Sequence, residues 1–227
     1  LLAVVGGMLA LQRGDADAAL RQVSLAMQQA PDDVQLRYVL GFSHMRKQHW
    51  AFAEQAFRGV VDKMPNTANL QVLISELVNR QGRPAEAADE LARLLAEHAT
   101  ATPAVYRAAG FLRIAANQPE QALPLLRSAL AAMPGNLPTL QALVAVWREL
   151  GLDDDARGSL DAALATTVDA PDLWRARLAF AQDADAARAV IQRWTAAMPQ
   201  STLPWEALLA QQSAADDQVG ADATAAK

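Results

Sequence analysis

The stretch that determines the fold is LGFSHMRKQHWAFAEQAFRGVVDKMP, residues 40–65. It holds a Leu40-Gly41 pair, then Ala53 and Phe57, and it closes on Pro65. Copies of its alanine recur at Ala19, Ala53, Ala87, Ala122, Ala156 and Ala187, and copies of its proline at Pro31, Pro65, Pro134 and Pro199. The alanines are 34, 34, 35, 34 and 31 residues apart. A nearly constant interval of this length indicates that one supersecondary unit is repeated along the chain.

The pattern resembles the tetratricopeptide repeat, a helix–turn–helix unit of 34 residues. The resemblance implies an all-α fold, a right-handed α-solenoid of about six repeats and a terminal helix, in which the first helices line a concave groove. The composition agrees, because 52% hydrophobic residues, mostly alanine and leucine, favour helix over sheet. We expect a single array over 1–212, with repeats at about 1–33, 34–67, 68–102, 103–136, 137–170 and 171–201, a terminal helix at 202–212, and a disordered acidic tail at 213–227.

Proline and glycine support this register independently. Ten of the eleven prolines fall at expected helix ends, and the exception, Pro124, should remove one backbone hydrogen bond and bend its helix. We expect close helix contact at Gly7, Gly41 and Gly110, and turns with positive φ at Gly14, Gly82 and Gly151. Candidate helix N-caps are Asp32, Asp33, Asn66, Thr67, Asn136 and Thr202.

The sequence shows no catalytic or metal-binding pattern, so we predict a protein that is not an enzyme and has no cofactor and no metal. There are no cysteines, and His44 and His49 are five residues apart, which does not match an H-x3-H metal pair. The Asp153-Asp154-Asp155 run fits solvated charge at a helix N-terminus better than a cation site. A net charge of −5 and a pI of about 5.2 argue against a nucleic-acid partner.

Apolar and arginine side chains in the first helices form the candidate binding surface. Within such a helix one face packs on neighbouring helices, and the resemblance implies that the other faces the groove. Aromatic residues with arginine on a water-facing side are typical of an interface; the alternative is that a slightly rotated helix buries them inside the array. The predicted partner-binding residues are Tyr38, Phe42, Met45, Arg46, Glu76, Asn79, Arg80, Arg107, Phe111, Ile114, Gln141 and Arg148.

A clamp for the C-terminal carboxylate of chaperone peptides, which occurs in some proteins of this family, is not matched here. The positions that correspond to the lysines and asparagines of that clamp hold Val4, Met8, Val39, Asn69 and Leu73, and four of these five residues are apolar.

The opening run, residues 1–12, is apolar but too short to span a bilayer, so we expect no direct membrane insertion by this segment. It fits the first helix of a repeat in register better than the end of a signal sequence or anchor. Its groove face holds Val4, Met8 and Leu11, although terminal repeats normally carry a polar cap. We therefore expect either a preceding segment or contact with another molecule at this end.

These observations favour a scaffold that binds a protein or an extended peptide. Two alternatives stay open: an accessory domain that presents substrates to an enzyme, and homo-oligomerisation through the array ends. The alanine-rich composition, with arginine preferred to lysine, resembles that of high-GC bacteria. Large bacterial arrays of this family serve in exopolysaccharide export, pilus assembly and outer-membrane assembly. By that analogy alone we favour the periplasm or cell envelope over the cytoplasm.

Overall fold

The computed structural model describes residues 2–61, 63, 68–97 and 102–214, and this part of the chain is helical without strands. Its helices are α1 (Leu2–Gln12), α2 (Ala16–Met27), α3 (Val34–Arg46), α4 (Trp50–Val61), α5 (Ala68–Arg80), α6 (Pro84–Glu97), α7 (Pro103–Ala115), α8 (Pro119–Ala132), α9 (Leu137–Leu150), α10 (Asp153–Thr166), α11 (Pro171–Ala179), α12 (Ala184–Ala197) and α13 (Leu203–Ala214). The expected all-α helical repeat fold is therefore confirmed. Residues 215–227 of the predicted tail lie outside the described residues.

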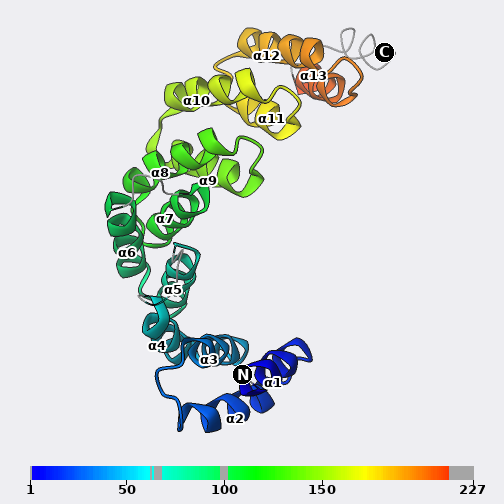
Figure 1. Cartoon of the computed structure of the whole chain (residues 1–227). Coiled ribbons are helices and arrows are strands. Elements are labelled where there is room, and N and C mark those ends of the chain that lie inside the picture. The colour runs from blue at the N-terminus through cyan, green and yellow to red at the C-terminus, as the bar shows by residue number, and fades with distance from the viewer. Residues whose placement is uncertain (1, 62, 64–67, 98–101, 215–227) are drawn as a thin grey trace. The chain divides into compact units, whose positions relative to one another are not determined.

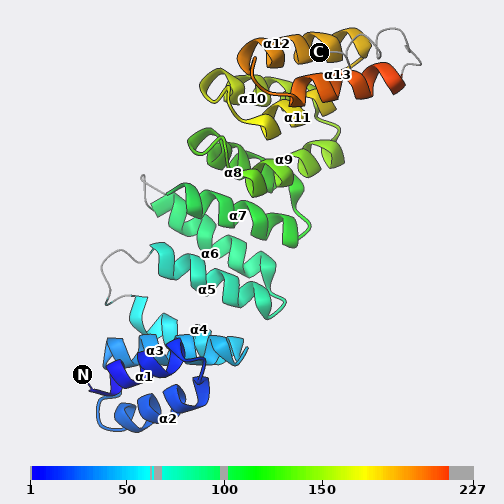
Figure 2. The ribbon, with the colours of Figure 1, turned by 90° about the vertical axis from the view of Figure 1, so that its right-hand side faces the viewer.

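The helices divide into two compact units, Leu1–Gln118 with α1 to α7 and Pro119–Lys227 with α8 to α13. Within the first unit, the first helices α1, α3, α5 and α7 lie on one side and α2, α4 and α6 on the other (Figure 1). Within each unit the helices lie stacked on one another in chain order when seen from the side (Figure 2). The predicted single array over 1–212 stays a prediction, and the units are described separately below.

Helix ends follow the local chemistry of the sequence. Asp33 and Asn136 are N-caps as predicted, because their side chains accept hydrogen bonds from Leu36 N at 3.0 Å and Thr139 N at 3.1 Å. The N-cap of α3 is Asp33, so the candidate Asp32 is wrong, and its side chain pairs with Arg37 at 3.3 Å instead. The predicted caps Asn66 and Thr67 lie outside the described residues. Helix α8 continues through Pro124 from Pro119 to Ala132.

Small residues let the two helices of a repeat approach closely. The repeated alanines Ala19, Ala53, Ala87, Ala122 and Ala156 are completely buried. A Cβ added at Gly41 would lie 2.6 Å from the ring of Phe57, and one at Gly7 would lie 2.9 Å from Val23 and from Val39. The predicted close contact is therefore confirmed at Gly7 and Gly41. In the first unit the core runs along this seam between first and second helices.

Each repeat also packs on the one before it. Helix α3 contacts both α2 and α1, and Leu36 and Val39 of α3 form a buried cluster with Val23 of α2 and Val4 of α1. Burial of such apolar side chains is the main favourable term in folding, at roughly 25 cal/mol per Å². Stability of this kind depends on neighbouring repeats. In the first unit, this stacking places the ends of α1, α3 and α5 around a common space.

Candidate functional site

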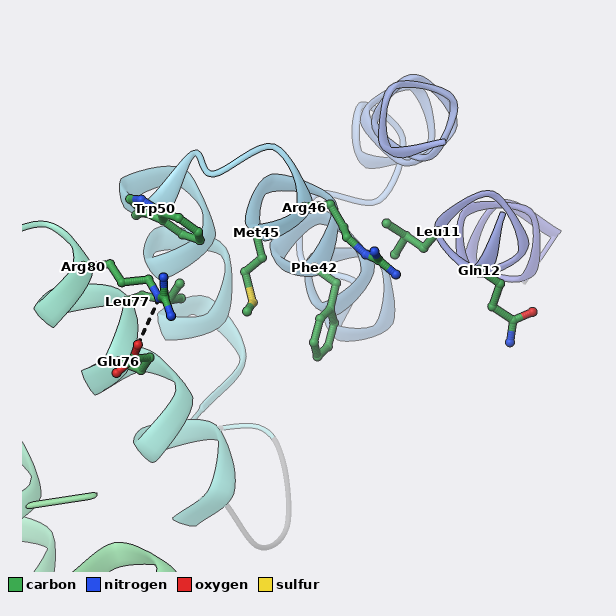
Figure 3. A pocket seen from close by; sticks show the side chains of 9 residues that line it. All are labelled: Leu11, Gln12, Phe42, Met45, Arg46, Trp50, Glu76, Leu77 and Arg80. Carbon is green, nitrogen blue, oxygen red and sulfur yellow. Dashed lines mark ion pairs between the residues drawn. The ribbon is translucent and has the colours of Figure 1, made fainter. Parts of the chain in front are cut away.

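An open pocket of about 510 Å³ lies on the first-helix side of the first unit. Three successive first helices, α1, α3 and α5, supply most of its lining, and the first residue of α4 completes it (Figure 3). We call it the α1–α3–α5 pocket. Its lining residues are Leu11, Gln12, Phe42, Met45, Arg46, Trp50, Glu76, Leu77 and Arg80.

One wall of the pocket is apolar and rigidly supported. Phe42 of α3 packs edge-on against the buried ring of Phe57 at 5.2 Å and against Tyr38 at 4.9 Å between ring centroids. Such edge-to-face pairs hold a ring in one orientation. Met45 extends beside Phe42 into the open space (Figure 3), and the fully buried Leu77 of α5 lies opposite. The pocket therefore presents a preformed apolar surface.

The charged groups of the pocket differ in whether they already have a partner. Arg80 pairs with Glu76 at 2.9 Å, and its guanidinium carbon lies 5.1 Å from the centre of the Trp50 ring. Glu76 therefore offsets the charge of Arg80. Arg46 is exposed and forms no ion pair with any residue that the structure describes. The pocket consequently carries one positive charge that is available to a ligand.

Five of the twelve predicted partner-binding residues, Phe42, Met45, Arg46, Glu76 and Arg80, meet in this pocket. Tyr38 lies behind Phe42 and also packs against Phe57, with ring centroids 5.8 Å apart. It is half-buried, as the packing alternative expects. Phe42 meets both expectations, since it packs on the second helix and still lines the pocket.

The other predicted residues lie elsewhere. Asn79 is half-buried on α5 and does not line the pocket. On α7, Arg107 and Phe111 are half-buried and Ile114 is 36% exposed. In the second unit, Gln141 and Arg148 are exposed on α9. The guanidinium of Arg148 lies 5.6 Å from the centre of the Phe180 ring in the same unit. A partner-binding role for these residues stays a prediction.

The expected groove face of α1 needs a correction. Val4 is only 7% exposed and belongs to the buried cluster with Val39, which itself is 1% exposed. Val4 and Val39 therefore both face the core. Helices α1 and α3 are rotated about their axes relative to the predicted orientation. Met8 is 46% exposed, and Leu11 lines the pocket.

The lining residues that the sequence did not indicate are Gln12, Trp50 and Leu77, whereas Leu11 was predicted to face the groove. Trp50 lies outside the prediction because it opens the second helix of its repeat, and the resemblance assigns the groove to first helices.

The rest of the described chain offers little sign of chemistry. No group of three or more His, Asp or Glu side chains in the described part could hold a metal ion. No described helix combines the length and apolar character needed to cross a membrane. His44 stacks on Phe52 at 5.2 Å and lies 5.8 Å from the ring of His49. Burial, helped by the nearby charges of His49 and Lys47, lowers the pKa of His44 below its ordinary value.

Residues 113–180 match the tetratricopeptide repeat family. No curated protein matches the sequence. Among solved structures, the chain is similar to a tetratricopeptide repeat protein from Parabacteroides merdae, with 14% identity and a TM-score of 0.59 over 98% of this chain and 89% of that one. It is also similar to PilW, a type IV pilus biogenesis factor, with 20% identity and a TM-score of 0.53 over 91% and 97%.

A third similar structure is that of Naa15/Naa10 bound to HypK-THB, with 16% identity and a TM-score of 0.63. That match covers 88% of this chain and 32% of that one. At these identities the structural likeness shows the fold alone.

Proposed function

We propose that this chain, a tetratricopeptide repeat protein, is a non-enzymatic scaffold. Its family is indicated by the match over residues 113–180 and by the repeat fold of its described helices. In this proposal the α1–α3–α5 pocket binds a segment of a protein partner. The single observation that supports it most is an open, largely apolar pocket on the first-helix side, with an arginine that lacks an ion-pair partner among the described residues.

The chemistry of the pocket suggests the chemistry of its ligand. A large apolar side chain would bury against Phe42 and Met45, where aromatic support limits the loss of side-chain entropy on binding. A carboxylate next to that side chain would pair with Arg46, whose planar guanidinium suits bidentate contacts with carboxylates. The proposed ligand is therefore a peptide with a large apolar residue beside an aspartate or glutamate.

A random peptide library displayed on phage tests this proposal. We expect peptides selected on the wild-type protein to share an apolar residue next to an acidic one. Their affinity should fall at least about fivefold with Arg46→Glu, because an exposed ion pair is typically worth up to about 1 kcal/mol and the new carboxylate repels the acidic residue of the peptide. Raising the salt concentration should weaken wild-type binding, since an exposed ion pair is screened. Fluorescence anisotropy with a labelled selected peptide measures both effects.

Arg13→Glu is the matched control. Arg13 is an exposed arginine of the same unit and does not line the pocket, so this variant makes the same charge change elsewhere. It should bind like the wild type. Equal binding by Arg46→Glu and wild type, or selected peptides without any shared acidic residue, would refute the pocket as the peptide site. Met45→Lys provides an independent variant on the apolar wall.

A role in bacterial cell-envelope assembly, such as pilus or exopolysaccharide export, is the narrower form of this proposal. The likeness to PilW, which extends over 91% of this chain, supports it at the level of the fold. Fractionation of cells that express the full-length protein is the test. Recovery with the periplasm or membranes agrees with the envelope role, and recovery in the cytosol alone contradicts it.

A further inference from the structure

The end of α3 and the turn after it hold two histidines directly beside residues of the α1–α3–α5 pocket. His44 directly precedes Met45 and Arg46 in α3, and His49 directly precedes Trp50, the first residue of α4. Met45, Arg46 and Trp50 all line the pocket (Figure 3). A hydrogen bond of 2.9 Å from His49 N to the carbonyl oxygen of His44 closes the turn. A change at either histidine would therefore reach one side of the pocket.

The His44 ring is packed as a neutral group. It stacks on Phe52, with ring centroids 5.2 Å apart, and lies 5.8 Å from the His49 ring. Its Nδ1 atom is buried and has no hydrogen-bond partner in the described part of the chain. Protonation would place a hydrogen on both ring nitrogens, so the cation would bury a donor that nothing accepts.

The charged groups around His44 do not favour a cation either. Those that act on its ring are His49 and Lys47, and His49 also becomes positive in acid. The carboxylate on this side is Asp17 of α2, which already pairs with Lys47. Arg21 of α2 adds a further positive charge near Asp17. A protonated His44 would therefore meet more positive than negative charge.

Repeat four shows how a cation is accommodated at the same position. Arg113 and His44 both stand nine residues before the repeated alanine of their repeat. Arg113 is only 9% exposed, and it pairs at 2.9 Å with Asp89 of the preceding second helix. The counterpart of Asp89 before His44 is Arg21, since each stands two residues after its repeated alanine. Repeat two thus places a titratable ring where the matching carboxylate is replaced by an arginine.

We propose that protonation of His44 in mild acid loosens the turn between α3 and α4 and lowers the affinity of the α1–α3–α5 pocket for its peptide. This inference rests on the proposed function and adds release by acid to it. Burial first, and the charges of His49 and Lys47 second, hold the pKa of His44 below its ordinary value of 6.5. The closed turn therefore favours the neutral ring, and the cost of keeping it closed appears as pH falls below 6.5.

Fluorescence anisotropy of a labelled selected peptide at about pH 7.5 and about pH 5.5 tests the proposal. Wild-type affinity should be at least about threefold lower at the acid pH, because fewer molecules are competent to bind. The acidic residue of the peptide has an ordinary pKa of about 4 and stays charged at both pH values, so the loss reports on the protein. His44→Gln should bind equally at both.

Arg21→Glu is a second variant, and it keeps His44. Arg21 is exposed on α2, and a glutamate there offers the cation a carboxylate, as Asp89 does for Arg113. This variant should lose less affinity in acid than the wild type. Arg93→Glu is the matched control, because it makes the same charge change at an exposed arginine of α6 that does not line the pocket. It should lose as much affinity as the wild type.

NMR of the peptide-free protein separates failure of this inference from failure of the proposed function. The ring resonances of His44 and the indole N–H resonance of Trp50 should shift together as pH falls. If they do so and no peptide binds at either pH, the proposed function fails and the acid-sensitive turn stands. Equal wild-type affinity at both pH values, or an equal acid loss in wild type and His44→Gln, would overturn the inference and leave the peptide site in place.

Discussion

The turn between the two helices of a repeat depends on a single residue with left-handed backbone. Gly14, Gly82 and Gly151 hold this position with φ of 80°, 79° and 66°, as predicted for the turn glycines. Gln48 and Asn117 hold the same position in repeats two and four with φ of 59° and 57°. A side chain with a Cβ pays about 1–2 kcal/mol for this conformation, and asparagine tolerates it better than glutamine. Gln48 therefore has the most strained backbone conformation of the five turn residues.

Gln48→Gly should raise the free energy of unfolding by about 0.5–1 kcal/mol, because relief of the strain exceeds the extra entropy that glycine gives the unfolded chain. Urea denaturation followed by circular dichroism measures the change. Gln48→Ala is the control, because alanine keeps the Cβ and should bring no gain. A Gln48→Gly protein no more stable than wild type would contradict this account of the turn.

At the scale of helices, a charged network ties repeat two to repeat three. Glu54 of α4 accepts hydrogen bonds from Arg58 at 2.8 Å, from Gln81 at 2.6 Å and from Arg83 at 2.7 Å. The Glu54 side chain is only 12% exposed. Burial acts to raise its pKa, but the hydrogen bonds from Arg58 and Gln81, together with the positive charges of Arg58 and Arg83, outweigh burial and hold the pKa of Glu54 below its ordinary value of 4.5.

Glu54→Gln should lower the free energy of unfolding at pH 7 by about 1–3 kcal/mol, because it removes the negative charge to which Arg58, Gln81 and Arg83 donate hydrogen bonds. The folded carboxylate has the lower pKa, so its contribution is fully present above pH 4.5 and is lost as pH falls through the folded pKa. Between pH 7 and pH 3, urea denaturation should show a smaller acid loss in Glu54→Gln than in wild type.

The comparison variant is Glu76→Gln, which removes an exposed (i, i+4) pair with Arg80. Exposed pairs typically contribute less than about 1 kcal/mol, so its effect should be small. Equal losses for Glu54→Gln and Glu76→Gln would mean that the network between the repeats adds nothing beyond a surface ion pair.

The positions of the helices along the chain could be predicted from the sequence, because one interval of about 34 residues repeats. The rotation of each helix about its own axis could not be predicted. Spacing shows that Tyr38 and Phe42 share a face of α3, but only packing on Phe57 shows how far that face turns inward. Trp50 reaches the pocket because the preceding turn places the start of α4 beside α5, where Arg80 lies over its ring. Contacts between helices determine these details, and they leave no periodic signal in a single sequence.

At the scale of the whole molecule, the chain consists of two units, and in a repeat protein each part is stabilised mainly by its neighbours. A local change should therefore affect one unit more than the other. The tryptophans allow this to be measured, because Trp50 is the one tryptophan of the first unit and the other four of the five lie in the second. In a Trp50→Phe background, fluorescence reports on the second unit, while circular dichroism reports on both.

Gly41→Ala in that background should destabilise the first unit by about 1–3 kcal/mol, because the added Cβ would lie 2.6 Å from the Phe57 ring. During urea unfolding we expect circular dichroism to show an earlier first phase, with little change in the fluorescence midpoint. Leu160→Ala, at a fully buried position of the second unit, should instead move the fluorescence midpoint, at a cost of about 2–5 kcal/mol. If Gly41→Ala moved both signals equally, the two units would unfold as one cooperative body, and nearest-neighbour stabilisation would not describe this chain.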